Sequence, residues 1–309
     1  MIVNFKNTIF ILVVLLFLFQ LIVMKQDSQI NDINKKRTVA LSTFSLYDIT
    51  KHIVDDTAKV TMILPFGVDA HSYEPSPKQV AELHDSDLVI YSGAGLEPWC
   101  KNFEFTNKAI DMSRYIELIR FDANSVHEHK HKDSGADPHY WLSIENMIKA
   151  TKVIKTELIR LIPINKELYE KNTLSYINML KKLDKDYKKR LSECKLDTII
   201  VNHNAYSYLS SSYSFNIEAL NGLSPDAQTN AKNMINLIED IKKHNVSTIF
   251  YESFSSDKAI KSIAKETNIN VESLHPLSNI TSDEAMKQLS YESIMRNNLE
   301  KISKALECI

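Results

Sequence analysis

Glycine, cysteine and net charge are all scarce in this sequence, and each shortage excludes a class of function. The five glycines form no GxGxxG pattern, and no P-loop lysine follows Gly93 and Gly95, so a nucleotide-binding loop is absent. The formal net charge is −2 at pH 7, whereas a nucleic-acid partner requires a basic face.

The three cysteines lie far apart in the chain, at Cys100, Cys194 and Cys308. None belongs to a CxxC pair, which disfavours a zinc–thiolate or thioredoxin-type site. In an oxidising compartment two of them are able to pair and leave the third free. Sequence alone does not establish which two pair, so the connectivity stays open.

An apolar run at residues 9–24 is the clearest global feature. It contains one polar residue, Gln20, and follows Lys6, which is typical of a secretory signal or signal anchor. As a helix it would measure about 24 Å, short of the roughly 30 Å hydrocarbon core. No Ala or Gly precedes Ala40 to mark a cleavage site, and no cysteine follows the run. The alternative, a core helix, would need burial on every face. We expect an exported, periplasmic or otherwise extracytoplasmic protein, released or tethered to the membrane by residues 1–24.

Strand and helix signals alternate on both sides of a helical centre, and 309 residues are enough for two domains. Short apolar, β-branched runs predict strands at 38–43, 60–64, 88–91, 198–201, 215–220, 248–251 and 269–274. Ser76, Pro77 and Gln79 predict a helix start with a capping box. This order predicts an α/β fold with two lobes, each a parallel sheet covered by helices.

One long helix, predicted over residues 164–192, separates the two sets of strands. At about 43 Å it is long enough to run between two lobes. We therefore divide the chain into five parts. They are a signal or anchor (1–24), a linker (25–37), an N-terminal lobe (38–163), a linking helix (164–194) and a C-terminal lobe (195–309).

Three of the ten histidines stand at strand ends or in polar loops. His71 follows the strand 60–64, His139 lies ahead of a helix cap at Ser143, and His203 follows the strand 198–201. In open α/β sheets ligands bind beyond the carboxyl ends of the strands, so these histidines predict a site between the lobes. Neutral imidazole suits zinc, copper or nickel, while manganese prefers carboxylates. Taken singly, each histidine is better explained as a hydrogen-bonded loop residue.

The segments around these histidines carry a family resemblance. They read "ILPFGVDAHSYEPSPKQVAELHDSDLVIYSGAGLEPW", "DPHYWLSIENM" and "VNHNAYSYLSSSYSFN", followed by "NGLSPDAQTN" and "YESFSSDKAIKSIAKETNINVESLHPLS". From about residue 38 to the C-terminus the chain resembles the zinc and manganese solute-binding proteins of ABC importers. The resemblance implies a C-clamp fold, in which two α/β lobes on one rigid helix hold a divalent metal. It implies the metal ligands His71, His139 and His203.

A receptor, and not an enzyme, is the function that this resemblance implies. Such a protein captures Zn²⁺ outside the cytoplasm and delivers it to the membrane permease of an ABC importer, whose cytoplasmic ATPase supplies the energy. We expect a monomer. Manganese is the alternative cargo, although manganese members carry Glu where this chain has His203. Alternatives of other classes are a three-histidine zinc hydrolase, in which an open fourth position activates water, and a surface adhesin.

The sequence departs from the family pattern at the fourth ligand. Zinc-binding members with a Glu ligand carry it near Ser278. The site therefore holds three imidazoles and a water, or borrows His275 or a nearby acid. Glu252, at the end of the strand 248–251, is such an acid. We interpret Glu252 as support for the cleft wall in preference to a ligand.

Several other residues invite a functional interpretation. His127, His129 and His131 alternate in a polar loop ahead of His139, a pattern that suits transient metal capture and resembles the His-rich loop of zinc-binding members. A solvated loop is the alternative. We interpret the remaining conspicuous aromatic residues as packing or cleft-wall residues: Trp99, Trp141, Tyr206, Tyr208 and Tyr213.

Overall fold

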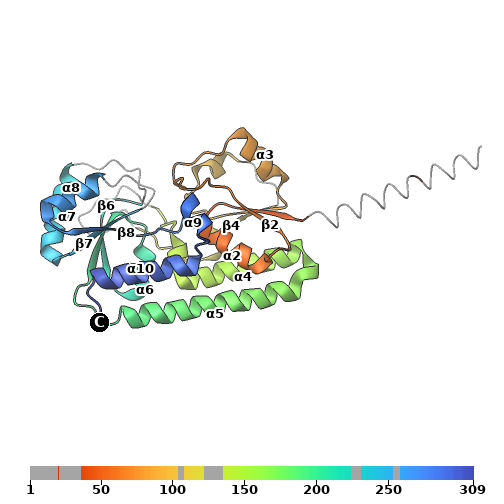
Figure 1. Cartoon of the computed structure of the whole chain (residues 1–309). Helices are drawn as coiled ribbons and strands as arrows, with labels where there is room; N and C mark the ends of the chain where they lie inside the picture. Colours follow the sequence, from red (N-terminus) through yellow and green to blue (C-terminus); the bar gives the residue numbers. More distant parts are fainter. Residues whose placement is uncertain (1–19, 21–35, 104–107, 122–134, 224–230, 253–257) are drawn as a thin grey trace, which may run out of the picture. The chain divides into compact units, whose positions relative to one another are not determined.

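The computed structural model describes residue 20 and residues 36–103, 108–121, 135–223, 231–252 and 258–309 (Figure 1). The chain divides into residues 1–37 and one compact unit, Thr38–Ile309, to which the following description applies. The apolar run, apart from Gln20, and the His127–His131 loop lie outside the described residues. Within the ranges given above, no helix is both long enough and apolar enough to cross a membrane.

The first sheet comprises β1 (Thr38–Leu41), β2 (Lys59–Met62), β3 (Leu88–Tyr91) and β4 (Ala109–Asp111). Their order is β2-β1-β3-β4, and every pair is parallel. Parallel neighbours need crossover connections, which α2 (Phe44–Val54) and α3 (Pro77–Asp85) supply. The predicted capping box at Ser76 is present, with Gln79 N–H donating to the Ser76 hydroxyl.

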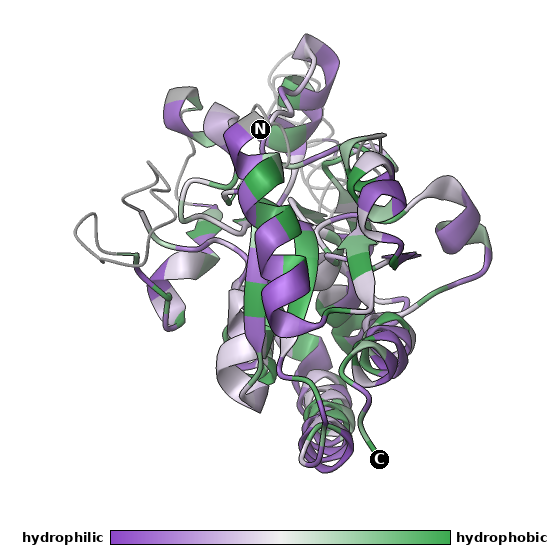
Figure 2. Cartoon of the chain, turned by 90° about the vertical axis from the view of Figure 1, so that its left-hand side faces the viewer, coloured by the Kyte–Doolittle hydropathy of each residue, from purple (hydrophilic) through white to green (hydrophobic). Residues whose placement is uncertain are grey.

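The second sheet repeats this arrangement with β5 (Thr198–His203), β6 (Asn216–Asn221), β7 (Thr248–Tyr251) and β8 (Asn270–Ser273). Its order is β6-β5-β7-β8, again with parallel pairs. The intervening helices are α6 (Ser207–Tyr213), α7 (Ala231–His244) and α8 (Lys258–Thr267). Figure 2, viewed from this lobe, shows mostly hydrophobic strands behind helices that mix hydrophobic and hydrophilic residues. The predicted two-lobed α/β class is confirmed.

Long helices connect the two sheets. They are α4 (Ile144–Leu161), α5 (Lys166–Arg190) and α10 (Tyr291–Ala305), and the short α9 (Ser282–Met286) precedes α10. The 3-10 turns are η1 (Pro98–Asn102), η2 (Met112–Tyr115), η3 (Tyr140–Leu142) and η4 (Pro163–Asn165). Because η4 begins at Pro163, α5 starts later than the predicted 164; it runs for 25 residues, about 38 Å. Figure 1 shows α5 running along both lobes.

One apolar core continues from the first lobe into the second. It joins Val39 of β1 with Ile154 of α4, Tyr187 of α5 and Phe250 of β7. Tyr187 also donates from its hydroxyl to the Met295 carbonyl in α10 at 2.7 Å. A smaller cluster fills the space between β7 and the helices α7 and α8. The continuous core makes the two lobes one packed body.

A disulfide joins Cys194 to Cys308, 114 positions apart in the sequence. It settles the pairing that the sequence left open, and it links the chain just after α5 to the C-terminus. Cys100 is the free thiol of the described residues and is half-buried. Burial, followed by the negative charges of Glu97 and Asp111, raises the pKa of the Cys100 thiol, so that it ionises less readily than an exposed thiol.

Candidate metal site

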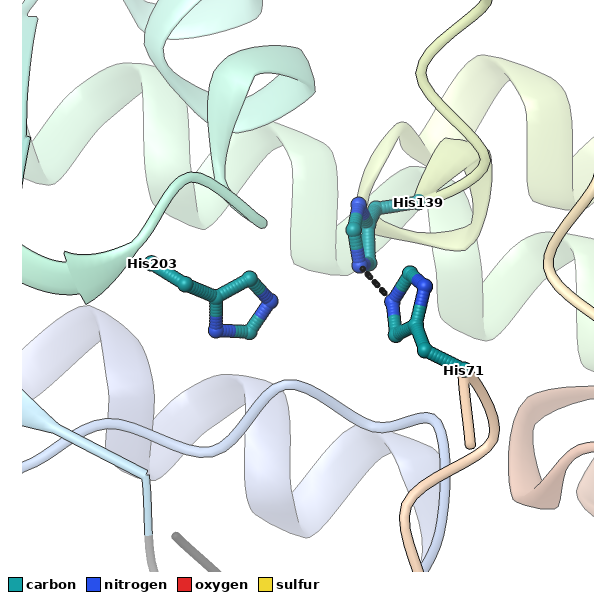
Figure 3. Close-up of side chains that lie close together, drawn as sticks. All are labelled: His71, His139 and His203. Carbon is teal, nitrogen blue, oxygen red and sulfur yellow. Dashed lines mark hydrogen bonds between the residues drawn. The ribbon is translucent and has the colours of Figure 1, made fainter. Parts of the chain in front are cut away.

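Three histidines from distant parts of the chain meet between the two sheets (Figure 3). His71 lies in the loop between β2 and α3, His139 immediately precedes η3, and His203 is the last residue of β5. One ligand nitrogen from each lies within 4.8 Å of the other two. His71 Nε2 and His139 Nε2 are 3.2 Å apart. The structure thus brings together the three histidines that the sequence singled out.

A short turn with the same sequence pattern sets the backbone at two of these positions. In Asp69-Ala70-His71, the His71 N–H donates to Asp69 Oδ1 at 2.7 Å. In Asp137-Pro138-His139, the His139 N–H donates to Asp137 Oδ1 at 2.9 Å. Each aspartate closes a local turn over its histidine, as aspartate commonly does. The Asp-x-His spacing was a sequence signal for both turns, and sequence reasoning passed over it.

Two of the imidazoles have a carboxylate at the nitrogen that faces away from the centre. His139 Nδ1 donates to Asp137 Oδ1 at 2.8 Å, and both side chains are buried. His203 Nδ1 lies 2.9 Å from Glu252 Oε1, and both of these side chains are buried as well. A carboxylate at Nδ1 retains the proton there and leaves the Nε2 lone pair free. The site has the carboxylate–histidine pairs that orient metal ligands, and Glu252 supports His203 as expected.

Charge and burial shift the pKa values of two of the histidines in opposite directions. Burial lowers the pKa of His71 well below its ordinary value, and positive charge on His139 or His203 lowers it further. Burial also opposes a charge on His203, but the charge of Glu252, with smaller effects from Asp69 and Asp137, raises the pKa of His203. His71 is therefore neutral and able to donate to a metal at pH 7, while protons compete for His203.

The spacing of the nitrogens suits a small divalent ion. Tetrahedral zinc with Zn–N bonds of about 2.05 Å places its nitrogens about 3.3 Å apart. The 3.2 Å between His71 Nε2 and His139 Nε2 is close to that value, and His203 offers a nitrogen within 4.8 Å of a ligand nitrogen of each. Three neutral nitrogens favour zinc, copper or nickel over manganese. The chemistry of the donor set therefore fits zinc.

The segment after β8 adds no further member to this group of histidines. Ser278 is buried, and its carbonyl accepts from Phe44 N–H at 2.9 Å. The ring of His275 accepts from Leu277 N–H at Nδ1, and its Nε2 lies 3.5 Å from Glu284 Oε2. In the described part of the chain, His71, His139 and His203 gather without a fourth metal-competent side chain.

The aromatic residues near the site pack as the sequence suggested. Trp141 is fully buried, lies edge-on to the His139 ring at 5.4 Å, and donates from its indole to the Pro276 carbonyl at 2.7 Å. Tyr206 and Tyr208 donate to backbone carbonyls of Leu274 and Asp137. These contacts fix the walls of the site.

A second group of metal-competent side chains lies in the C-terminal lobe. Glu218 of β6 and Asp240 and His244 of α7 place ligand atoms within 4.8 Å of one another, and all three are half-buried. Sequence reasoning missed it, although Asp240 and His244 have the i, i+4 spacing of one helix face. Carboxylates gather at protein surfaces without a metal, so we assign this group no role.

Residues 39–305 match the family model described as zinc-uptake complex component A, periplasmic. The chain belongs to this family. The family comprises solute-binding receptors, as the resemblance of the sequence implied, and not enzymes.

Three relatives illustrate how far the similarity reaches. The zinc-binding lipoprotein AdcA of Streptococcus pneumoniae is 31% identical over 281 residues, 88% of this chain and 56% of that protein. The high-affinity zinc uptake system protein ZnuA of Bacillus subtilis is 32% identical over 283 residues, 88% of each chain. The Zn(II)-bound ZnuA-like domain of S. pneumoniae AdcA superposes with a TM-score of 0.73 at 29% identity, covering 88% of this chain and 100% of that domain. The chain spans about half the length of the AdcA relatives.

Proposed function

We propose that this protein is an extracytoplasmic zinc receptor that binds one Zn²⁺ through His71, His139 and His203 and delivers it to the permease of an ABC importer. The convergence of the three imidazoles between the lobes carries the proposal. Zinc appears in the names of the relatives AdcA and ZnuA, and a Zn(II)-bound structure exists for the AdcA domain. These relationships support zinc as the cargo and not as a resident cofactor.

The donor atoms of the site support zinc over manganese. The three donors are nitrogens, whereas manganese prefers carboxylate oxygens. The nearby carboxylates of Asp137 and Glu252 contact the outer nitrogens of His139 and His203. There they strengthen the imidazoles as donors and offset the positive charge of the ion. Manganese remains the alternative cargo that a competition experiment distinguishes.

The same placement of carboxylates favours a receptor over a hydrolase. A zinc hydrolase needs a general base within reach of a metal-bound water. Asp137 and Glu252 each contact a ligand histidine on the side away from the centre, so neither is placed as that base. We therefore assign no catalytic residue, and the energy for import would come from the separate ATPase.

The domain arrangement that accompanies this function is also proposed. Residues 1–24 act as a signal or membrane anchor and residues 25–37 as a linker. Residues 38–163 and 195–309 form the lobes, joined by 164–194. Export or tethering would present the metal site outside the cytoplasm as a monomer, next to the permease that receives the ion.

Metal content tests the proposal. The unit Thr38–Ile309, which carries both sheets and the site, is purified untagged, and its metal is measured by elemental mass spectrometry, followed by competition between zinc and manganese. We expect one zinc per chain, lost in His203→Ala and retained in His84→Ala, an exposed histidine outside the site. Absence of bound metal, or preference for manganese, would overturn the proposed cargo.

A further inference from the structure

The segment after β8 crosses from the second lobe to the first. This crossing segment, residues 275–280, lies against the N-terminal lobe through three backbone carbonyls. The carbonyl of Pro276 accepts from the Trp141 indole at 2.7 Å and that of Leu277 from the Ser45 hydroxyl at 2.7 Å. Ser278 O accepts from Phe44 N–H at 2.9 Å. The segment is therefore fixed on the first lobe before it reaches Asn279.

Asn279 uses its side chain to bind a turn of the first lobe. It is fully buried, and its Nδ2 donates to the carbonyls of Pro65 at 2.6 Å and Val68 at 2.8 Å. Its Oδ1 accepts from Ile280 N–H at 2.8 Å. Both amide protons of Asn279 are thus used on two carbonyls of the same turn.

That turn leads directly to the first metal-competent histidine. Val68 N–H donates to the Pro65 carbonyl at 3.3 Å, and Gly67 has a φ of +73°, which glycine adopts without strain. A third bond joins the same segments, since Gly67 N–H donates to the Ile280 carbonyl at 2.9 Å. His71 follows three residues after Val68, with its N–H on Asp69. The position of the turn therefore sets the position of the His71 backbone.

His71 depends on this support more than the other two histidines. His139 and His203 each have a carboxylate at Nδ1, from Asp137 and Glu252. Among the described residues His71 has no ion pair of that kind, and its imidazole contacts His139 instead. Figure 3 shows it on a loop facing the other two rings. Within the described residues, hydrogen bonds of its own backbone and of the preceding turn tie it to the rest of the molecule.

We infer that Asn279 is a positioning residue for the zinc site, acting through the turn Pro65–Val68 on His71. The inference rests on the proposed function. The inference also gives the crossing segment a role although Ser278 stands in place of a Glu. The segment positions the ligand His71 of the first lobe and supplies no metal ligand of its own. Loss of a partner that contacts a metal ligand directly weakens metal binding by roughly 10-fold to 100-fold. Asn279 acts through a turn and not on His71 itself, so we expect the lower end of that range.

Asn279→Ala in the intact chain, with zinc affinity measured by chelator competition, tests the inference. We expect affinity to fall by about 10-fold. Asn146→Ala is the matched control, because the buried Asn146 also bridges backbone, donating to the Glu117 carbonyl at 2.9 Å and accepting from Glu117 N–H at 3.3 Å. It should lower the metal-free melting temperature and leave zinc affinity unchanged. Asn279→Ser, which withdraws both amide donors without burying a charge, replaces Asn279→Ala if the alanine variant does not fold.

A double-mutant cycle distinguishes positioning from general destabilisation. If Asn279 acts through His71, Asn279→Ala costs nothing further in a His71→Ala background but still weakens binding about 10-fold in a His203→Ala background. Unchanged affinity in Asn279→Ala, an equal loss in Asn146→Ala, or an equal loss in both histidine backgrounds would overturn the inference alone. A parent protein that binds no zinc would overturn the proposed function together with it.

Discussion

The two lobes share a sheet order but present their histidines in different ways. β2-β1-β3-β4 and β6-β5-β7-β8 are the same arrangement, in which the first strand of each lobe lies between the second and third. The second lobe places His203 on the end of the buried strand β5, where the sheet itself fixes it. The first lobe places His71 and His139 on loops, where aspartates close each turn. His203 is thus held by its strand and the carboxylate of Glu252, whereas His71 is held by a local turn and by the segment that packs on it.

The largest expected effect comes from removing the strand-borne histidine. His203→Ala leaves two imidazoles, so zinc affinity should fall by more than about 100-fold, beyond the cost of losing an outer partner. His139→Ala should lower zinc affinity by the same factor if the histidines of the two lobes contribute equally to binding. The measurement is chelator competition at pH 7.5 on each variant. Binding of zinc by His203→Ala with the affinity of the parent would remove the second lobe from the site.

The pH dependence of zinc affinity tests the role of the carboxylate beside the strand-borne His203, and Glu252→Gln is the variant to use. The charge of Glu252 raises the pKa of His203, so on acidification His203 takes up a proton in competition with zinc. Zinc affinity should therefore decline as pH falls through that raised pKa. The substitution lowers the pKa of His203 and moves the decline to lower pH, while affinity at neutral pH falls roughly 10-fold. Zinc titrations from about pH 5 to pH 8 follow both changes. A profile identical to that of the parent would show that Glu252 is not coupled to the site.

The disulfide should contribute to the stability of the protein and hardly at all to metal binding. Cys194→Ser with Cys308→Ser opens a loop of 114 positions, which should lower the free energy of unfolding by about 3–5 kcal/mol. Zinc affinity of the folded protein should stay within about two-fold, since neither cysteine touches the site. Denaturant unfolding with chelator present measures the change. Cys100→Ser, the same chemical change at a free thiol, is the control, and an equal loss there would contradict the assignment.

Ser278→Ala has the smallest expected effect. Ser278 meets the first lobe through its carbonyl, which the substitution keeps, so zinc affinity should change by less than about two-fold. A fall of 10-fold or more in a competition titration would mean that the hydroxyl takes part in metal binding. In that case the crossing segment would supply a metal ligand, and not only support for His71.

Local sequence patterns predict much of the fold, but they do not predict the long-range contacts. Buried strands such as β3 and β5 are continuous apolar runs, so periodicity and turn residues identify them. The edge strand Ala109–Asp111 was missed because three half-buried residues make no such run. His71, His139 and His203 could be selected because strand ends are where α/β folds bind ligands. Nothing local predicts that Asn279 meets Pro65, over two hundred positions earlier, or that Cys194 meets Cys308, because those contacts depend on how the lobes pack.

The Cys194–Cys308 bond makes a closed covalent ring of the second lobe. His203 and Glu252 both lie inside that ring, between the two cysteines. A protease that cuts the lobe once therefore releases no fragment, since both pieces stay linked through the bond near the end of α5. A nicked copy keeps its histidine and its carboxylate on one molecule until the disulfide is reduced.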